Sequence, residues 1–253
     1  MRVLSLVVDG FERAASQGLI PWIFEQNADV ICLQNTQCSE YSIKLDSAFP
    51  EGYHAYFADN YDNPSINGCA LYCRDMPKAI MMGLGFIDFD HLGIYLQADY
   101  DTCSVGSILV PSNVAPDGDR SLKLSFLHQF HAHLQKVRNK KRDFILCGGW
   151  EMAWRPMDAE ESGNRIDIPG FSTKERDWLG SLYRDGYADA FREAEPDSEE
   201  FTWWPEGDDS PGIRTDTQII SESLCASVES ASVYTNDVFS SHAPVIVDYD
   251  ITL

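Results

Sequence analysis

The fold is decided by the stretch Ala28-Asp29-Val30-Ile31-Cys32-Leu33-Gln34-Asn35 and by its echo, Lys141-Arg142-Asp143-Phe144-Ile145-Leu146-Cys147-Gly148-Gly149. Each stretch follows a helical pattern, runs through apolar and β-branched residues, and ends in polar or glycine residues, which is typical of a buried strand. Two helix–strand units of this kind predict two similar α/β halves. The ends of such strands are also where folds of this kind place their functional sites.

The same pattern extends outward from these two strands. Apolar runs at residues 3–8, 69–72, 94–98, 105–110 and 245–247 predict further buried strands. Helical spacing of apolar residues covers 11–23 and 127–137, and Ser172 three residues before Glu175 indicates a helix start. We expect a single domain over residues 1–253 with an α/β fold, a four-layered sandwich of two packed, mixed β-sheets flanked by helices.

The composition argues against several classes of protein. The 253 residues carry a formal net charge of −21, so long-range repulsion opposes direct binding to naked DNA or RNA. Nowhere does an apolar run approach the roughly 18 residues of a membrane span, and residues 1–10 lack a signal-peptide cleavage site. The seven cysteines include no Cys-x-x-Cys pair, which favours buried free thiols and a cytoplasmic location.

The main cluster of positive charge is a run of basic residues shortly before residue 144. It contains five of the 19 basic residues of the chain: Lys136, Arg138, Lys140, Lys141 and Arg142. On so acidic a protein this run is the candidate site for phosphates or for an acidic partner. The alternative is a solvated helix end, where cations interact favourably with the helix dipole.

Six short motifs stand in order along the chain: Ser5-Leu6-Val7-Val8-Asp9-Gly10, Ile31-Cys32-Leu33-Gln34-Asn35-Thr36, Leu146-Cys147-Gly148-Gly149, Phe201-Thr202-Trp203-Trp204, Gly212-Ile213-Arg214-Thr215-Asp216 and Ser240-Ser241-His242-Ala243-Pro244-Val245. In order and spacing they resemble the endonuclease/exonuclease/phosphatase superfamily, whose members include exonuclease III-like enzymes. The resemblance covers nearly the whole chain and implies the fold of that superfamily. It also implies metal-assisted phosphodiester hydrolysis, with a carboxylate on Mg²⁺ and an Asp–His pair on the phosphoryl oxygens.

The pattern of the superfamily is matched at Asp9, Asp216 and His242. It is not matched at six positions: Val7, Asn35, Leu109, Gly149, Glu151 and Ser241. The resemblance implies that Asn35 stands where the family has its metal-binding Glu, and Gly149 where it has an essential Asp. Ser241 replaces an Asp beside His242, so we expect the imidazolium of His242 to be less favoured.

These losses predict a catalytically inactive protein that is not an enzyme and needs no cofactor, because such groups act as a unit. Further segments, including Gly83-Leu84-Gly85-Phe86 and Gly186-Tyr187-Ala188-Asp189-Ala190, resemble the catabolite repression control proteins. That resemblance implies a regulator with the nuclease fold that works with the RNA chaperone Hfq on A-rich mRNA and represses translation.

Two alternatives stay open. Asp9, Glu151 and Asp216 can converge on Mg²⁺, which would make the protein an exonuclease III-like DNA nuclease or phosphodiesterase with a rearranged acidic site. The remaining pocket can instead hold a small phosphorylated ligand. Trp150 and Trp203 flank the site positions and are candidates to line that pocket, although packing in the core is the commoner role of Trp.

Overall fold

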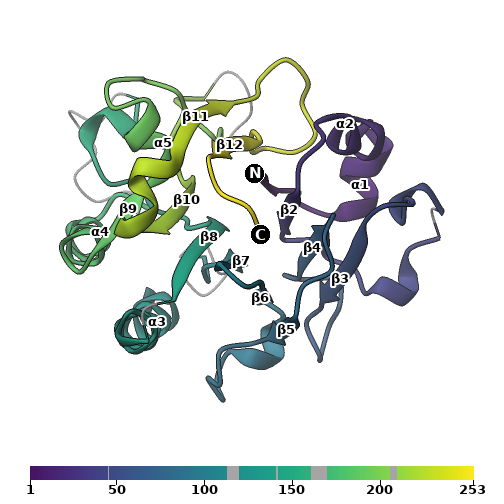
Figure 1. Cartoon of the computed structure of the whole chain (residues 1–253), viewed down its shortest axis with the longest axis horizontal. Coiled ribbons are helices and arrows are strands. Elements are labelled where there is room, and N and C mark those ends of the chain that lie inside the picture. The colour runs from purple at the N-terminus through teal and green to yellow at the C-terminus, as the bar shows by residue number, and fades with distance from the viewer. Residues whose placement is uncertain (45, 113–119, 141, 161–169, 206–209) are drawn as a thin grey trace.

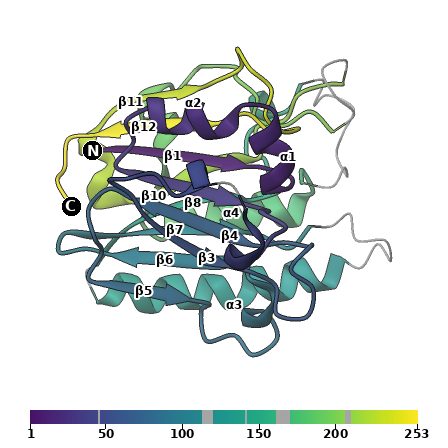
Figure 2. The same ribbon diagram turned by 90° about the vertical axis from the view of Figure 1, so that its right-hand side faces the viewer.

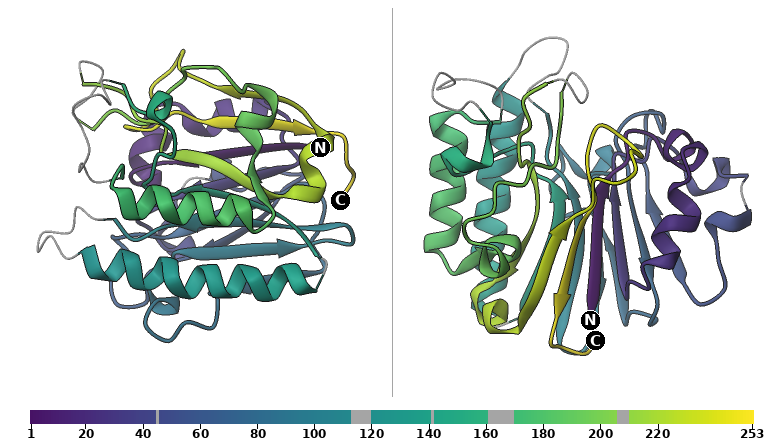
Figure 3. Two further views of the ribbon diagram at one scale, coloured as in Figure 1. Left: turned by 90° about the vertical axis from the view of Figure 1, so that its left-hand side faces the viewer. Right: turned by 90° about the horizontal axis from the view of Figure 1, so that it is seen from above.

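The computed structural model describes residues 1–44, 46–112, 120–140, 142–160, 170–205 and 210–253. Two six-stranded sheets pack face to face, and helices lie over the outer face of each sheet (Figure 1, Figure 3). This arrangement confirms the predicted four-layered α/β sandwich of two mixed sheets.

The first sheet has the strand from residues 28–35 near its centre. Its strands are β1 (Arg2–Val7), β2 (Val30–Gln34), β3 (His54–Ala58), β4 (Cys69–Cys73), β11 (Val228–Val233) and β12 (Val245–Tyr249). They lie in the order β11-β12-β1-β2-β4-β3, where β1 and β2 pair in parallel and the other neighbours pair antiparallel. Side chains alternate along β2, so that Ile31 and Leu33 belong to the outer apolar cluster while Val30 and Cys32 face the other sheet.

The second sheet is built in the same way around the echoed strand. Its strands are β5 (Ala79–Met82), β6 (Tyr95–Asp99), β7 (Cys103–Leu109), β8 (Asp143–Gly149), β9 (Tyr187–Asp189) and β10 (Asp216–Ser221). They lie in the order β5-β6-β7-β8-β10-β9, and β7 and β8 pair in parallel. Because β2 and β8 each lie beside one parallel partner near the middle of their sheets, the prediction of two similar halves is confirmed.

Five α-helices are found in the described residues: α1 (Phe11–Ser16), α2 (Leu19–Glu25), α3 (Arg120–Asn139), α4 (Thr173–Arg184) and α5 (Ala190–Ala194). The pair α1 and α2 covers the first sheet, and α3 and α4 cover the second (Figure 3). The helix expected over residues 11–23 is divided at Gly18, whose φ of 91° is left-handed. Among all the residues that the structure describes, no helix has the length and apolar character that a membrane crossing requires.

The two chain ends meet at one edge of the molecule (Figure 2), where the amino group of Met1 donates to the carbonyl oxygen of Tyr249 at 2.6 Å. Strand β1 runs from this edge toward the opposite one (Figure 2), so the residues that follow β1 lie far from the termini. All seven cysteines are free and six of them are buried, as expected from their apolar surroundings.

Ser172 caps α4 as predicted. Its hydroxyl accepts a hydrogen bond from the backbone N–H of Glu175, and the Glu175 carboxylate accepts one from Ser172 N at 3.0 Å. The substitution Ser172→Ala should lower the free energy of unfolding by about 1 kcal/mol, measured by urea denaturation. Thr173→Ala, at the next and exposed position, is the control with little expected effect. Equal effects of the two substitutions would contradict the capping role.

Candidate functional site

Three of the candidate residues follow the ends of β1, β2 and β8. Asp9, Asn35 and Glu151 all have left-handed backbone conformations, with φ of 50°, 55° and 56°. This region is sparsely populated by residues other than glycine, and Asn and Asp enter it more readily than Glu. Strained conformations concentrate at active sites and ligand clamps. The three strand ends therefore mark a candidate site on the side away from the termini.

Asp9 is the centre of a small hydrogen-bond cluster. The Asn35 amide donates from Nδ2 to Asp9 Oδ1 at 2.9 Å, and the Ser241 hydroxyl donates to Asp9 Oδ2 at 2.5 Å. The family resemblance places carboxylates at positions 35 and 241. Here two neutral donors surround one carboxylate, so the repulsion that three adjacent carboxylates would create is absent.

His242 and Asp216 form a buried ion pair. His242 Nδ1 lies 2.8 Å from Asp216 Oδ2, and both side chains are 4 % exposed. The indole of Trp203 stacks on the imidazole, with ring centroids 5.8 Å apart. Burial lowers the pKa of His242, but Asp216, Glu151 and Asp9 together raise it to about 9.

The imidazole is consequently charged at neutral pH. The expectation that Ser241 would leave the imidazolium less favoured is wrong, because Asp216 contacts the ring directly and supplies the negative charge.

Strand β10 and the turn before it place Asp216. The residue pairs with Gly149 of β8, and its backbone N–H donates to Thr202 Oγ1 at 3.0 Å. Asp216 Oδ2 is hydrogen-bonded to the His242 ring and accepts a hydrogen bond from the hydroxyl of Thr215. Asp216 Oδ1 is buried and has no hydrogen-bond partner among the described residues. One oxygen of this carboxylate is therefore buried without a hydrogen bond to compensate its charge.

Glu151 is held through its backbone. Lys123 Nζ donates to the carbonyl oxygen of Glu151 and to Glu175 Oε1, both at 2.7 Å. Lys123 and Glu175 are 1 % and 2 % exposed, so this is a buried ion pair. Burial raises the pKa of Glu151, and the charges of Asp216 and Asp9 raise it further, while His242 and Lys123 act in the opposite direction.

Sequence reasoning missed Lys123. The signal was present, because Lys123 stands four and seven residues before Leu127 and Phe130, on the apolar face of α3. A lysine in such a position points inward and needs a buried acidic partner. Glu175 is that partner, although the sequence showed it only as a residue that supports a helix start.

The side chains of Val7 and Leu109 fit against Gly149. A Cβ atom at Gly149 would lie 2.7 Å from Val7 Cγ2 and 3.4 Å from Leu109 Cδ1. Val7 is 1 % exposed and Leu109 is 7 % exposed, so neither side chain has open space to move into. Three departures from the family pattern are therefore one coupled change, in which two apolar side chains occupy the space beside a glycine.

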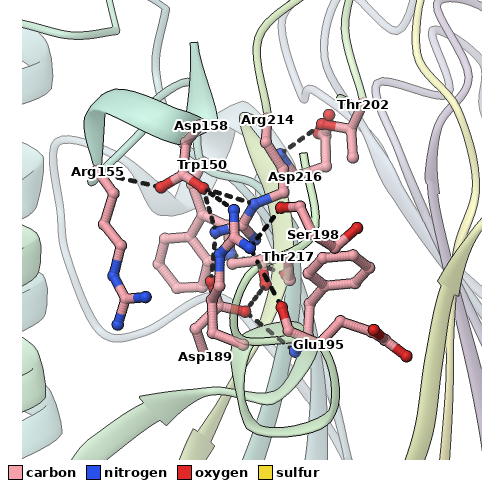
Figure 4. A network of polar contacts seen from close by, with 12 residues as sticks. Trp150, Arg155, Asp158, Asp189, Glu195, Ser198, Thr202, Arg214, Asp216 and Thr217 are labelled. Carbon is pink, nitrogen blue, oxygen red and sulfur yellow. Dashed lines mark hydrogen bonds and ion pairs between the residues drawn. The ribbon is translucent and has the colours of Figure 1, made fainter. Parts of the chain in front are cut away.

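A buried network of two arginines and two aspartates supports the start of β10 (Figure 4). Arg214 donates from Nη2 to Asp189 Oδ2 at 2.7 Å and from Nε to Asp158 Oδ1 at 3.0 Å. Arg192 also pairs with Asp158. Burial raises the pKa of Asp158, but the two arginines outweigh it and the net shift is downward. Since Arg214 is two residues before Asp216, the network fixes the segment that presents the ion pair.

The other predicted site residues lie elsewhere. Trp150 is 1 % exposed and donates from Nε1 to the carbonyl oxygen of Thr217 at 3.0 Å, so it belongs to the core and does not line a pocket. Of the basic run, Lys136, Arg138 and Lys140 are exposed, and Lys141 lies outside the described residues. Arg142 is tied to the carbonyl oxygen of Tyr100 at 2.7 Å. This run is at the beginning of β8, whereas Glu151 follows its end.

Comparison with known proteins shows which family the chain belongs to. The sequence pattern of the Endonuclease/Exonuclease/phosphatase family matches residues 8–218, and the chain belongs to this family. A DNA-(apurinic or apyrimidinic site) endonuclease of Dictyostelium discoideum is 27 % identical, covering 99 % of this chain and 71 % of the relative. An exodeoxyribonuclease of Bacillus subtilis is 26 % identical, covering 97 % of this chain and 98 % of the relative.

Solved structures share the fold. An AP endonuclease from Archaeoglobus fulgidus superimposes with a TM-score of 0.89 at 20 % identity, over 99 % of this chain and 100 % of that one. A 3′-5′ exonuclease from Neisseria meningitidis superimposes with a TM-score of 0.85 at 18 % identity, over 99 % and 100 % of the two chains. At this identity the likeness shows the fold alone.

The prediction of a catalytically inactive regulatory protein is wrong, because the relatives matched over nearly the whole chain are named as DNA nucleases. The same finding overturns the predicted action with Hfq on A-rich mRNA, and the relatives give no support to the finer resemblance to catabolite repression control proteins. The physical reason is that the prediction gave the six changed positions more weight than the three residues that match the family pattern. The six changed positions leave the ion pair of His242 and Asp216 intact.

The fit between Val7 and Gly149 gives a stability prediction. The substitution Gly149→Ala should cost about 1–3 kcal/mol of unfolding free energy, because the new methyl group collides with Val7. In the double variant with Val7→Ala, this cost should shrink, giving a coupling of about 0.5–3 kcal/mol by double-mutant cycle. Urea denaturation of the four proteins measures it, and strictly additive effects would contradict the coupled change.

The ion pair makes stability depend on pH. The pKa of His242 is about 9 in the folded protein and near its ordinary value of 6.5 when unfolded. The contribution of the pair is therefore complete below pH 6.5 and declines as the pH rises toward 9. Urea denaturation across this range should show a loss of stability in the parent that is missing from His242→Gln. Parallel pH profiles of the two proteins would contradict the pairing.

Proposed function

We propose that this protein is a divalent-metal-dependent hydrolase of phosphate esters in DNA, an exonuclease III-like nuclease with a rearranged acidic site. The observation that carries the proposal is the buried ion pair of His242 and Asp216, set among three strand ends with strained backbones. Membership of the family supports the class of reaction. The names of the relatives support DNA as the substrate.

His242 supplies positive charge where a phosphate would sit. Its Nδ1 faces Asp216, and Nε2 makes no hydrogen bond with the described residues, so Nε2 is the donor left for a phosphoryl oxygen. Because its pKa is about 9, the ring is cationic under physiological conditions. A preorganised cation at a water-poor position stabilises negative charge that develops on an oxygen, which is the main source of rate in such sites.

Asp216 acts as the positioning residue of this pair. Its carboxylate fixes the tautomer and the direction of the imidazole, and the network around Arg214 in turn fixes Asp216 (Figure 4). Trp203 covers one face of the ring and limits access of water. The imidazolium is thus held still before substrate arrives, so little reorganisation is needed during reaction.

The carboxylates of Asp9 and Glu151 fit a magnesium ion in chemistry. Hard oxygen ligands suit Mg²⁺, which in nuclease-type sites takes one or two carboxylates together with substrate phosphate and water. The raised pKa of Glu151 indicates that this carboxylate lacks compensation, since it makes no hydrogen bond among the described residues. A cation near Asp9 and Glu151 would relieve their repulsion.

When bound, Mg²⁺ would supply a water of lowered pKa and charge stabilisation at the phosphate. The chain offers fewer ligands than the family pattern, because Asn35 is neutral and uses its amide as a donor to Asp9. Within the described residues, no group of three or more His, Cys, Asp or Glu side chains is arranged around a metal position. The proposal therefore includes weak binding of Mg²⁺, in the range where substrate phosphate completes the coordination.

Nuclease assays test the proposal. The purified protein should cleave a duplex with an abasic site or a recessed 3′ end in Mg²⁺ and lose this activity in EDTA. His242→Asn and Glu151→Gln should each lower kcat/KM at least 100-fold, since a lost charge-stabilising group costs about that much. Asp177→Asn, an exposed site on α4, removes a carboxylate without touching the site and serves as the control.

Two outcomes would contradict the proposal. One is the absence of cleavage of both duplexes at high protein concentration in Mg²⁺ and Mn²⁺. The other is cleavage by His242→Asn and Glu151→Gln at the rate of Asp177→Asn, which would indicate a contaminating nuclease.

A further inference from the structure

A pocket of about 490 Å³ opens beside His242, on the side of the ion pair that faces α1. Its walls include Arg13 and Gln17 at the end of α1, Trp204 and Pro205, and the loop from Tyr234 to Val238. Ser241 and His242 line it as well, so the pocket and the ion pair are contiguous. Its volume lies within the range of small-molecule sites.

The pocket has aromatic walls that are held in place. Tyr234 packs against Trp22 with ring centroids 4.5 Å apart, and Trp22 packs against Phe239 at 4.9 Å. Trp204 is anchored by its backbone N–H, which donates to the carbonyl oxygen of Ser241 at 3.2 Å. Tyr234, whose ring is packed against Trp22, and Trp204 both line the pocket and bring aromatic rings to it. Such surfaces bind nucleobases by stacking and do so with little sequence preference.

The pocket also has an unused positive charge. Arg13 is exposed, and its guanidinium makes no hydrogen bond or ion pair with the described residues. The protein has a net charge of −21, and this guanidinium brings a positive charge to the pocket that no ion pair with the described residues neutralises. A guanidinium recognises phosphate by paired hydrogen bonds. Asp237 is the one acidic residue of the described lining, and its carboxylate accepts a hydrogen bond from the hydroxyl of Tyr234.

We propose that this pocket binds a single nucleotide, with the base against Trp204 and Tyr234 and the phosphate toward Arg13. The inference rests on the proposed function, which places a phosphate ester at the adjoining His242. A free mononucleotide brings few negative charges to this acidic protein, so the pocket can be tested with a mononucleotide alone. In the proposed reaction on DNA, the occupant of the pocket would be the last nucleotide of a strand.

Calorimetry with deoxyadenosine 5′-monophosphate tests the inference in EDTA, where hydrolysis does not contribute. The nucleotide should bind at least tenfold more tightly than 2-deoxyribose 5-phosphate, which lacks the base, and than inorganic phosphate. Trp204→Leu and Arg13→Gln should each weaken binding at least tenfold, and Arg13→Gln should also reduce the dependence on salt. Asp237→Asn should strengthen binding because it removes the opposing charge.

Arg184→Gln is the matched control, since it removes one exposed arginine at the end of α4, away from the pocket. Binding should then stay at the parent value. Melting temperatures of all variants identify any that fail to fold, and Asp237→Asn, whose effect is a gain, keeps the test decisive if Trp204→Leu is unstable. Equal affinity for the nucleotide and for 2-deoxyribose 5-phosphate would overturn the inference, as would parent-like binding by Arg13→Gln.

The two proposals fail separately. If the variants change nucleotide binding as expected but the protein does not cleave DNA, the proposed hydrolysis is wrong and the pocket is still a nucleotide site. If Trp204→Leu and Arg13→Gln cleave DNA at the parent rate and the protein does not bind the nucleotide, the pocket is not a nucleotide site and the proposed hydrolysis still holds.

Discussion

The buried contact between His242 and Asp216 joins the two halves of the protein. Asp216 begins β10 in one sheet, and His242 comes just before β12 in the other. Either charge alone would be buried without compensation, which costs several kcal/mol, roughly 3–5 when a partner is removed. The two sheets must therefore meet in one arrangement. Trp203 reinforces it, because this residue forms isolated bridges with both His242 and Ile213.

The changed residues around this pair compensate one another. Asn35 and Ser241 stand where the family resemblance implies carboxylates, and both donate hydrogen bonds to Asp9. Val7 fills the space beside Gly149, the position where the resemblance implies an Asp, so this pair changes both volume and charge. Such paired changes preserve a stable site floor while lowering its total negative charge. The groups left to act on a phosphate are the imidazolium of His242 and the carboxylate of Glu151, which has no hydrogen bond to compensate it among the described residues.

The sequence was informative where residues were buried on both faces of a sheet. Strands β2, β7 and β8 read as continuous apolar runs and were predicted, as was the capped start of α4. Strand β10 was missed because its buried positions include Thr217 and Gln218, the latter bonded to Val3 O at 3.0 Å. Strand β5 was missed because it is an exposed edge. Asp9, Asp216 and His242 were found from motifs. The position of Lys123 on the apolar face of α3 indicates that its side chain is buried, but only the tertiary structure shows that it contacts Glu151.

The charge state of His242 is the claim on which the account of the site depends. An NMR titration of the imidazole, assigned by comparison with His242→Gln, measures it directly. The account predicts a titration midpoint near pH 9, because Asp216 lies 2.8 Å from Nδ1 and outweighs the effect of burial. A midpoint at or below 6.5, the ordinary value of histidine, would mean a neutral ring at physiological pH and would contradict the account.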